Sequence, residues 1–484
     1  MSAMLSSAEV RECSIADPRA SLAMARRLRE IGVSAGDRVM LKADNSVAFV
    51  AALFALLHLD VSLVLVDHQQ AVAESRHIID LTRTSWVLLG DGIREPSGAR
   101  VIRFERLLDG TAGDAGPERL DLDRWRSRGD ALIAWSSGST GRPKAVVRSG
   151  GAFLGNIERT GRAMAYRRTD MFLPLLPFSH QYGLSLLFLA FLSGAGLLVA
   201  PYRRLDLALR SAHRATVLDA TPATYRSLVS LLERKPELRS GLESVRLFCT
   251  GGAPLDTRFS ERFRAALGRP LLDGYGSTEL GNIALATPER PVGCGHPLDG
   301  IEVEILRDDG GVAAAGEVGE VVVWSPDAME GYLRGDDTVE PVQPPPYRTG
   351  DLGYLDDRGH LFVVGRKRAV HRLGHTLYPE VLERKAEAIG RPVAVVPLEN
   401  ERRGCTLVFA VEDPDTGDAR MWRARIGAHL APYESPDHVV VFGRFPVNRT
   451  GKTDRAELRR MCWEAVFRPS EAGVPVDAEG DARA

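Results

Sequence analysis

Cysteine is scarce in this chain of 484 residues. The five cysteines lie far apart and form no C-x-x-C pair: Cys13, Cys249, Cys294, Cys405 and Cys462. That spacing fits neither a disulfide framework nor a zinc site, and it favours a reducing compartment. A surplus of positive charge is absent too, since the formal net charge is −2. Nucleic-acid binding that relies on bulk positive charge is therefore disfavoured.

The sequence offers little evidence for export or for a membrane span. Its first residues, MSAMLSSAEVREC, carry charges early and contain no apolar core, so a secretory signal is not expected. The uncharged stretch 184–200 has 17 residues, which is short for a transmembrane helix. A Ser-Gly-Ala-Gly break at 193–196 favours a buried helix followed by a buried strand. We therefore expect a cytoplasmic protein without stable membrane insertion.

Short apolar runs alternate with helical patterns through the first three quarters of the chain. Residues 61–67, 132–137 and 245–250 have the length and apolar character of buried strands, and amphipathic segments lie between such runs. This alternation predicts an α/β fold with largely parallel sheets. From about 291 to 364, short strands with glycine-rich turns predict a β-rich subdomain instead.

The length of the chain allows about three average domains. We expect a large N-terminal domain over 1–365, made of two α/β subdomains and the β-rich subdomain. A small, mobile α+β domain is expected over 366–465. From Pro469 the sequence is acidic and lacks aromatic residues, so the tail 466–484 is predicted to be disordered.

A loop rich in small residues follows the apolar run at 132–135 and reads SSGSTGRPK over 136–144. Small residues allow backbone N–H groups to approach an anion closely, and the hydroxyl groups add further donors. A Walker loop is excluded, because its lysine follows the second glycine directly. The candidate phosphate-binding residues are Ser136, Ser137, Gly138, Ser139, Thr140, Gly141 and Lys144.

This loop resembles the signature of the adenylate-forming superfamily of AMP-binding enzymes. That superfamily includes acyl-CoA synthetases, luciferases and peptide-synthetase adenylation domains. Further family motifs follow in the same order, namely GYGSTE at 274–279, YRTGD at 347–351, a domain junction at Gly365 and Arg366, and PVNRTGK at 446–452. The resemblance covers about residues 35 to 460. It implies ATP-dependent activation of a carboxylic acid as an acyl-adenylate, release of pyrophosphate, and transfer to a thiol.

The resemblance assigns roles on the nucleotide side. Glu279 would hold Mg²⁺ against the phosphates, because a hard cation prefers oxygen ligands, and Thr278 would contact the α-phosphate. Asp351 would accept hydrogen bonds from the ribose hydroxyls. Tyr275 would offer adenine a flat face. The other implied nucleotide contacts are Gly252, Ala253, Pro254, Gly276 and Arg366.

Two catalytic roles and the acyl pocket are also implied. Lys452 would bridge the carboxylate and the α-phosphate during adenylation, a task that suits a mobile point charge. His180 would close over the nascent adenylate. Gln181 stands where amino-acid-activating relatives typically carry Asp, which disfavours an α-amino acid and points to an aryl or hydroxylated acid. Gly251 would line the same pocket, and small residues elsewhere would equally admit an alkyl chain.

The second half-reaction depends on the domain junction. Arg368 stands at the hinge where relatives usually carry Asp or Lys, and it keeps the positive charge of the Lys variant. His371 replaces a lysine that many thioester-forming relatives have, whereas Gly374 and the following HTLYPEVLE match the stretch along the pantetheine route. The cations at 366, 367, 368 and 372 could meet CoA phosphates or an acidic carrier protein. Both acceptors stay open, coenzyme A or a phosphopantetheine on a carrier protein, with ATP and Mg²⁺ as the other ligands.

Two further readings belong to different classes. A non-catalytic adenylate sensor predicts loss of Glu279 or Lys452, and the sequence retains both. A membrane-bound, transporter-like acyl ligase requires insertion of residues 184–200.

Overall fold

The computed structural model describes residues 10–13, 18–96, 100–108, 119–136, 144–341, 345–367, 370–372, 375–400, 404–415, 417–430, 434–448, 451–468 and 476–478. Several predicted site residues lie outside this described part: Ser137, Gly138, Ser139, Thr140, Gly141, Arg368 and Gly374. For His371 the backbone is described and the side chain is not.

The first α/β sheet has the strand order β18-β17-β7-β6-β3-β2-β4-β5. Strands β2 to β6 run parallel, whereas β7, β17 and β18 extend the sheet in antiparallel fashion. The strands are β2 (Arg38–Lys42), β3 (Ser62–Leu65), β4 (Trp86–Leu89), β5 (Arg100–Arg103), β6 (Leu132–Ser136), β7 (Lys144–Arg148), β17 (Gly331–Leu333) and β18 (Val339–Pro341). The helices along this part are α1 (Arg19–Ile31), α2 (Val47–His58), α3 (Val72–Thr82), η1 (Phe104–Leu108), α4 (Asp123–Arg126) and α5 (Gly150–Met164).

The second α/β sheet has the order β1-β9-β8-β10-β11-β12-β13-β14, and its central strands β9 to β12 are parallel. Its strands are β1 (Arg11–Cys13), β8 (Met171–Leu175), β9 (Gly196–Val199), β10 (Val217–Ala220), β11 (Leu247–Gly251), β12 (Leu271–Ser277), β13 (Gly281–Leu285) and β14 (His296–Pro297). The associated helices are α6 (Gln181–Ser193), α7 (Leu205–Ser211), η2 (Ala212–Arg214), α8 (Pro222–Arg234), η3 (Pro236–Leu242) and α9 (Thr257–Leu267). The predicted α/β class with parallel sheets is confirmed.

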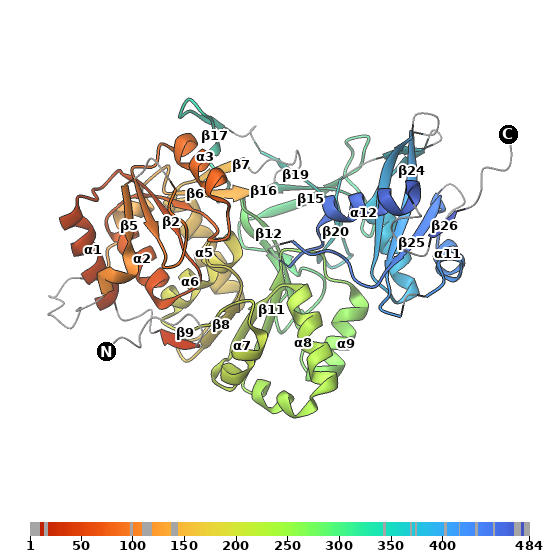
Figure 1. The fold of residues 1–484 in the computed structure, drawn as a ribbon, viewed down its shortest axis with the longest axis horizontal. Helices are drawn as coiled ribbons and strands as arrows, with labels where there is room; N and C mark the ends of the chain where they lie inside the picture. Colours follow the sequence, from red (N-terminus) through yellow and green to blue (C-terminus); the bar gives the residue numbers. More distant parts are fainter. Residues whose placement is uncertain are drawn as a thin grey trace.

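The predicted β-rich segment forms an antiparallel sheet in the order β15-β16-β19-β20. Its strands are β15 (Glu302–Leu306), β16 (Gly319–Trp324), β19 (Tyr347–Leu355) and β20 (Leu361–Arg366). Figure 1 shows this sheet between the α/β sheets and the C-terminal elements, which gather at one end of the molecule.

The C-terminal part combines a sheet in the order β23-β24-β25-β26 with flanking helices. Its elements are β21 (Val370–Arg372), β22 (His375–Leu377), α10 (Pro379–Ala386), η4 (Glu387–Ile389), β23 (Val393–Asn400), β24 (Gly404–Glu412), α11 (Ala419–Gly427), β25 (His438–Phe442), α12 (Arg455–Phe467) and β26 (Val476–Ala478). Strand β26 corrects the prediction of a wholly disordered tail, because its backbone pairs antiparallel with β25.

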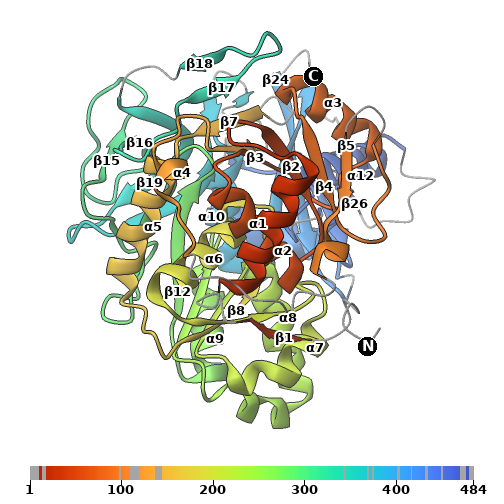
Figure 2. The ribbon, with the colours of Figure 1, turned by 90° about the vertical axis from the view of Figure 1, so that its left-hand side faces the viewer.

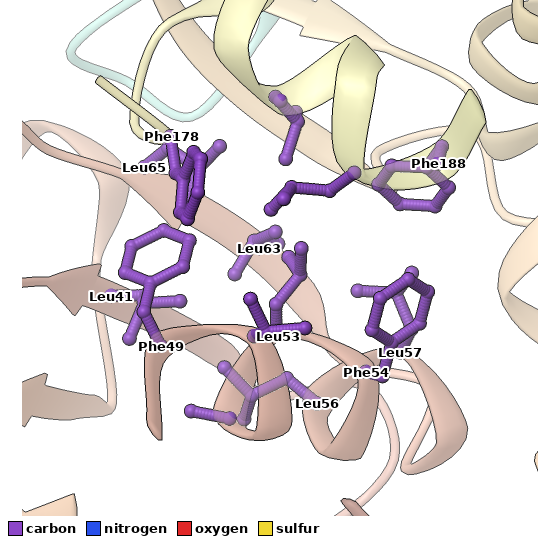
Figure 3. Close-up of a cluster of buried hydrophobic side chains, with 14 of the residues drawn as sticks. Leu41, Phe49, Leu53, Phe54, Leu56, Leu57, Leu63, Leu65, Phe178 and Phe188 are labelled. Carbon is purple, nitrogen blue, oxygen red and sulfur yellow. The ribbon is translucent and has the colours of Figure 1, made fainter. Parts of the chain in front are cut away.

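Two helices that are apolar on nearly all sides lie in the main core. Figure 3 shows Phe49, Leu53 and Leu57 of α2 pointing toward α6, which carries Phe188. The rings of Phe54 and Phe188 are 5.5 Å apart between centroids. A helix without a polar face must be buried, which explains why α2 and α6 lie inside the fold. Figure 2 shows α1 in front of this layer.

The apolar stretch 184–200 falls on α6 and β9, as a helix followed by a strand. This confirms the interpretation of that stretch as two elements of a folded core. Among the helices that the structure describes, none combines the length and the apolar character that crossing a bilayer requires.

Candidate active site

The two ends of the predicted phosphate loop lie side by side. Ser136 of β6 and Lys144 of β7 are register partners in an antiparallel pair, so the loop leaves and re-enters the sheet at one point. Strand β17 pairs with β7 and places Tyr332 beside Lys144, whose Nζ lies 4.8 Å from the centre of that ring. The sheet therefore places Lys144 beside Ser136, where the phosphate loop begins.

Glu279 occupies the turn between β12 and β13 and lies in the same cluster. Its Oε1 accepts a hydrogen bond of 3.3 Å from the hydroxyl of Tyr332, and its backbone oxygen accepts one of 2.7 Å from the amide of Met329. Thr278 precedes it in the turn and is half-buried. Tyr332 thus joins the predicted phosphate lysine to the predicted metal ligand. Sequence reasoning missed this tyrosine, because MEGYL carries no motif.

Asp351 is the centre of a second cluster. Its Oδ2 accepts a hydrogen bond of 2.7 Å from the hydroxyl of Tyr275, and its Oδ1 lies 3.0 Å from Nε of Arg366. Arg366 also donates to the backbone oxygen of Thr349 at 3.0 Å. Burial raises the pKa of Asp351, whereas Arg366 and the Tyr275 hydroxyl lower it. Each carboxylate oxygen has further lone pairs, so this pairing is compatible with ribose hydroxyls as additional donors.

Lys452 lies in a tight turn that reaches this cluster from the C-terminal part. The amide of Lys452 donates to the side-chain oxygen of Asn448 at 3.0 Å, and the amide of Asn448 donates to the backbone oxygen of Lys452 at 2.7 Å. A β-carbon at Gly451 would lie 3.7 Å from the hydroxyl of Thr221, which caps α8. A β-carbon at Gly252 would lie 3.8 Å from Nζ of Lys452. The turn therefore packs against the large N-terminal part.

The charge on Lys452 is coupled to the second cluster. Burial among the surrounding protein atoms and the positive charge of Arg366 lower the pKa of Lys452, whereas Asp351 raises it. The side chain is nevertheless exposed to solvent. An arriving anion would favour the ammonium form, so the lysine is placed to receive negative charge.

Glycines shape the backbone beside Lys452. Gly252 has a φ of +80°, a conformation that residues with a β-carbon rarely adopt. Ala253 is half-buried and Pro254 is exposed in the same loop after β11. A β-carbon at Gly276 would lie 2.5 Å from the backbone oxygen of Gly281, so β13 leaves no room for a side chain there.

His180 is the N-cap residue of α6, and its side chain pairs with a residue that the sequence did not single out. Its Nε2 lies 3.1 Å from Oδ2 of Asp67, which follows β3. Burial raises the pKa of Asp67, but hydrogen bonds from His180 and from the amide of Gln69 hold it at about 2. Gln181 follows directly; within the described residues, its amide oxygen and nitrogen are shielded from solvent and have no hydrogen-bond partner.

A family model with the description "AMP-binding enzyme" matches residues 19–333, which is more than half of the chain. The chain belongs to the AMP-binding enzyme family. A relative of this AMP-binding enzyme, the 2-succinylbenzoate–CoA ligase of Bacillus pumilus, is 27% identical over 455 residues, which cover 90% of each chain. The long-chain-fatty-acid–CoA ligase FadD13 of Mycobacterium tuberculosis is 28% identical over 468 residues, again 90% of each chain.

Solved structures agree with this assignment. The O-succinylbenzoate coenzyme A synthetase of Bacillus subtilis in complex with ATP and a magnesium ion is 26% identical, with a TM-score of 0.77 and coverage of 91% of this chain and 93% of that chain. ATP-bound MatB from Rhodopseudomonas palustris has a TM-score of 0.82 at 23% identity and covers 93% of each chain, which shows a shared fold.

The thiol side of this AMP-binding enzyme requires a correction. Arg372 is one of the cations that, on the sequence, could meet CoA phosphates or a carrier protein. Its side chain is only 8% exposed, lies 2.6 Å from Asp437 and donates to the backbone oxygen of Ser435, so its charge is already neutralised inside the fold. Lys367 is likewise paired with Asp308 at 2.9 Å. The backbone of His371 lies in β21, paired with β22.

Proposed function

We propose that this AMP-binding enzyme is an AMP-forming acid–CoA ligase. It activates a carboxylic acid with ATP as an acyl-adenylate, releases pyrophosphate, and transfers the acyl group to coenzyme A. The observation that carries the proposal is the position of Lys452, next to Gly252 and electrostatically coupled to Asp351 and Arg366. Two relatives that are named as CoA ligases, and whose alignments cover 90% of both chains, support the same reaction.

Adenylation requires the substrate carboxylate to attack the α-phosphorus of ATP while pyrophosphate departs. Negative charge accumulates in this transition state, so cations and oriented donors carry the catalysis. Lys144 faces the phosphates from the end of the loop, and Thr278 donates near the α-phosphate. Lys452, which lies beside Gly252, neutralises the attacking carboxylate and the α-phosphate together. Asp351 holds the ribose, with Arg366 and Tyr275 fixing its orientation.

Glu279 is the residue that would hold Mg²⁺. A magnesium ion in nucleotide sites is typically bound by one or two carboxylates together with substrate phosphates. Glu279 fits this role because, among the described residues, its Oε1 makes a single long hydrogen bond of 3.3 Å, to Tyr332, whose ring centre also lies 4.8 Å from Nζ of Lys144. The ion would offset the charge of the phosphates.

The acid is proposed to be aryl or hydroxylated. A shielded amide without a partner among the described residues, as in Gln181, gains most from a ligand that supplies a hydroxyl group. His180, oriented by Asp67, closes over the adenylate at the same end of the site. An alkyl acid is the alternative that the small residues near this end would admit.

Coenzyme A is the proposed acceptor, and a phosphopantetheine on a carrier protein is the alternative. The CoA ligases among the relatives favour coenzyme A. The ion pairs of Arg372 and Lys367 remove cations that either acceptor could use, so they do not discriminate between the two.

Acid-dependent ATP–pyrophosphate exchange with alkyl, aryl and hydroxyaryl acids tests the first step. Coenzyme A, pantetheine and a phosphopantetheinylated carrier protein, offered with the best acid, then test the second. We expect AMP and pyrophosphate as products and a CoA thioester. Formation of ADP and phosphate, or absence of exchange with every acid for a folded enzyme, would overturn the proposal. Thioester formation on the carrier protein alone would select the alternative acceptor.

A further inference from the structure

Tyr182, the second residue of α6, lies at the acyl end of the site. A β-carbon at Gly251 would lie 3.4 Å from its Cε1, and a β-carbon at the next residue, Gly252, would lie 3.8 Å from Nζ of Lys452. Two consecutive glycines therefore separate the proposed catalytic lysine from the edge of this aromatic ring. If Lys452 contacts the reacting carboxylate, a group that extends from that carboxylate past Gly251 would meet Tyr182.

The Tyr182 side chain is hydrogen-bonded to a buried carboxylate, that of Asp219. The hydroxyl of Tyr182 donates to Oδ1 of Asp219 at 2.9 Å, and Asp219 is only 1% exposed. In the sheet, Asp219 of β10 is the register partner of Cys249 in β11. Gly251 lies two residues after Cys249, so it projects from the same face of the sheet. Asp219 thus lies further from the carboxyl end of the sheet than Gly251, and Tyr182 contacts both positions.

Burial of the Asp219 carboxylate lowers the stability of the fold. Its neighbours on this face, Val217, Leu247 and Cys249, belong to the apolar core. Among the described residues, no protein donor bonds its Oδ2. A buried carboxylate with one unmatched oxygen destabilises a protein relative to an apolar residue of similar size. Stability alone therefore does not explain it, whereas control of Tyr182 does, because a hydrogen bond to a carboxylate selects one of the staggered rotamers.

We propose that Asp219 is a positioning residue that fixes the Tyr182 ring as the end wall of the acyl site, so that short or flat acids are activated and long alkyl chains are excluded. The inference rests on the proposed ligase function and specifies the class of acid within it. A benzoate-like or short alkyl acid ends before the ring. A long chain requires the ring to turn away, and the hydrogen bond to Asp219 opposes that rotation.

The test uses the full chain, four acids and two readouts. Benzoate, hexanoate, dodecanoate and palmitate are compared by kcat/KM for ATP–pyrophosphate exchange. Their acyl sulfamoyl adenosines, which mimic the adenylate and need no turnover, are compared by calorimetric Kd. We expect the wild type to favour benzoate over palmitate by at least about a hundredfold. Tyr182→Ala should reduce this preference at least about tenfold, because it raises kcat/KM for the long acids and tightens binding of their analogues.

Variants of the hydrogen bond separate positioning from packing. Tyr182→Phe keeps the ring and loses the bond, and Asp219→Leu keeps an apolar core and loses the acceptor. Both should reduce the preference for short acids less than Tyr182→Ala does. Phe191→Ala is the matched control, since it truncates an aromatic residue of the same helix whose ring packs on Phe54 at 4.7 Å. This control should lower stability and leave the chain-length preference unchanged.

The proposal is overturned if the wild type handles palmitate as well as benzoate in both readouts. It is also overturned if Tyr182→Ala, or Tyr182→Phe where the alanine variant does not fold, leaves the preference unchanged. Absence of exchange with every acid, together with length-dependent binding of the adenosine analogues, contradicts the proposed ligase function. The same result supports the Tyr182 ring as the end wall of the acyl site. If no analogue binds, both proposals are wrong.

Discussion

Replacing Asp219 by asparagine changes the pH dependence of stability in a direction that the structure defines. Burial raises the pKa of Asp219 from 3.8 to about 7, against the opposing hydrogen bond from Tyr182. The folded chain therefore holds this proton more tightly than the unfolded chain does. The stability that Asp219 contributes is fully present below its unfolded pKa and is lost as the pH rises through the folded pKa.

The size of this loss follows from the difference between the two pKa values. About three units at about 1.36 kcal/mol each give a loss of roughly 4 kcal/mol between about pH 4 and pH 8. An asparagine side chain does not titrate, so Asp219→Asn escapes the loss. Asp273, whose pKa burial also raises to about 7, titrates in both proteins and cancels from the comparison.

Urea unfolding at several pH values between about 4 and 8 measures this effect, with near-ultraviolet circular dichroism as the signal. The free energy of unfolding of Asp219→Asn minus that of the wild type should increase by roughly 4 kcal/mol across this range. A difference that stays constant within about 1 kcal/mol refutes the argument from burial.

Three further predictions concern the site. Glu279→Gln should raise the Mg²⁺ concentration for half-maximal exchange about tenfold or more, because a ligand charge is lost; an unchanged magnesium titration contradicts the metal role. Tyr275→Phe removes the donor to a buried oxygen of Asp351 and should weaken AMP binding by about 1–3 kcal/mol in calorimetry, whereas wild-type affinity shows that this bond does not orient the carboxylate. Asp67→Asn should lower kcat of adenylation about tenfold with little change in KM for ATP, since it frees His180; equal changes in both constants speak against positioning.

Much of the architecture was predictable from local pattern. Alternation of apolar strand-length runs with amphipathic segments identified the parallel sheets, and the helix-then-strand interpretation of 184–200 holds in α6 and β9. The residues quoted from the nucleotide motifs also converge, with Asp351 and Arg366 in direct contact and Lys452 close by. Such motifs are readable because one backbone turn supplies several contacts at fixed spacing.

The features that escaped prediction depend on contacts between distant segments. Tyr332 contacts Glu279 across 53 positions of the sequence, and Asp67 contacts His180 across 113 positions. Neither Tyr332 nor Asp67 lies in a motif that could be recognised from the sequence. Asp219 reads as a single polar residue in an apolar strand, so only the fold reveals its bond to Tyr182. These partners could not be paired without knowing which strands and helices are neighbours.

Two expectations about the C-terminal part failed for different physical reasons. Arg372 looked available because arginine is usually exposed, but an ion pair with Asp437 buries it. The acidic tail looked unable to fold alone, yet Val476–Ala478 pairs with the edge of an existing strand, which requires backbone groups and no apolar core.

The central claim is that Lys452 forms the adenylate at a site built mainly by the large N-terminal part. The most direct measurement compares wild type and Lys452→Ala in two half-reactions, acid-dependent ATP–pyrophosphate exchange and thioester formation from a preformed acyl-adenylate and coenzyme A. Lys235→Ala, which removes an exposed lysine at the end of α8, serves as the control. We predict that Lys452→Ala loses exchange at least about a hundredfold and keeps thioester formation. Exchange at the wild-type rate, or equal loss of both half-reactions in a folded variant, would contradict the account.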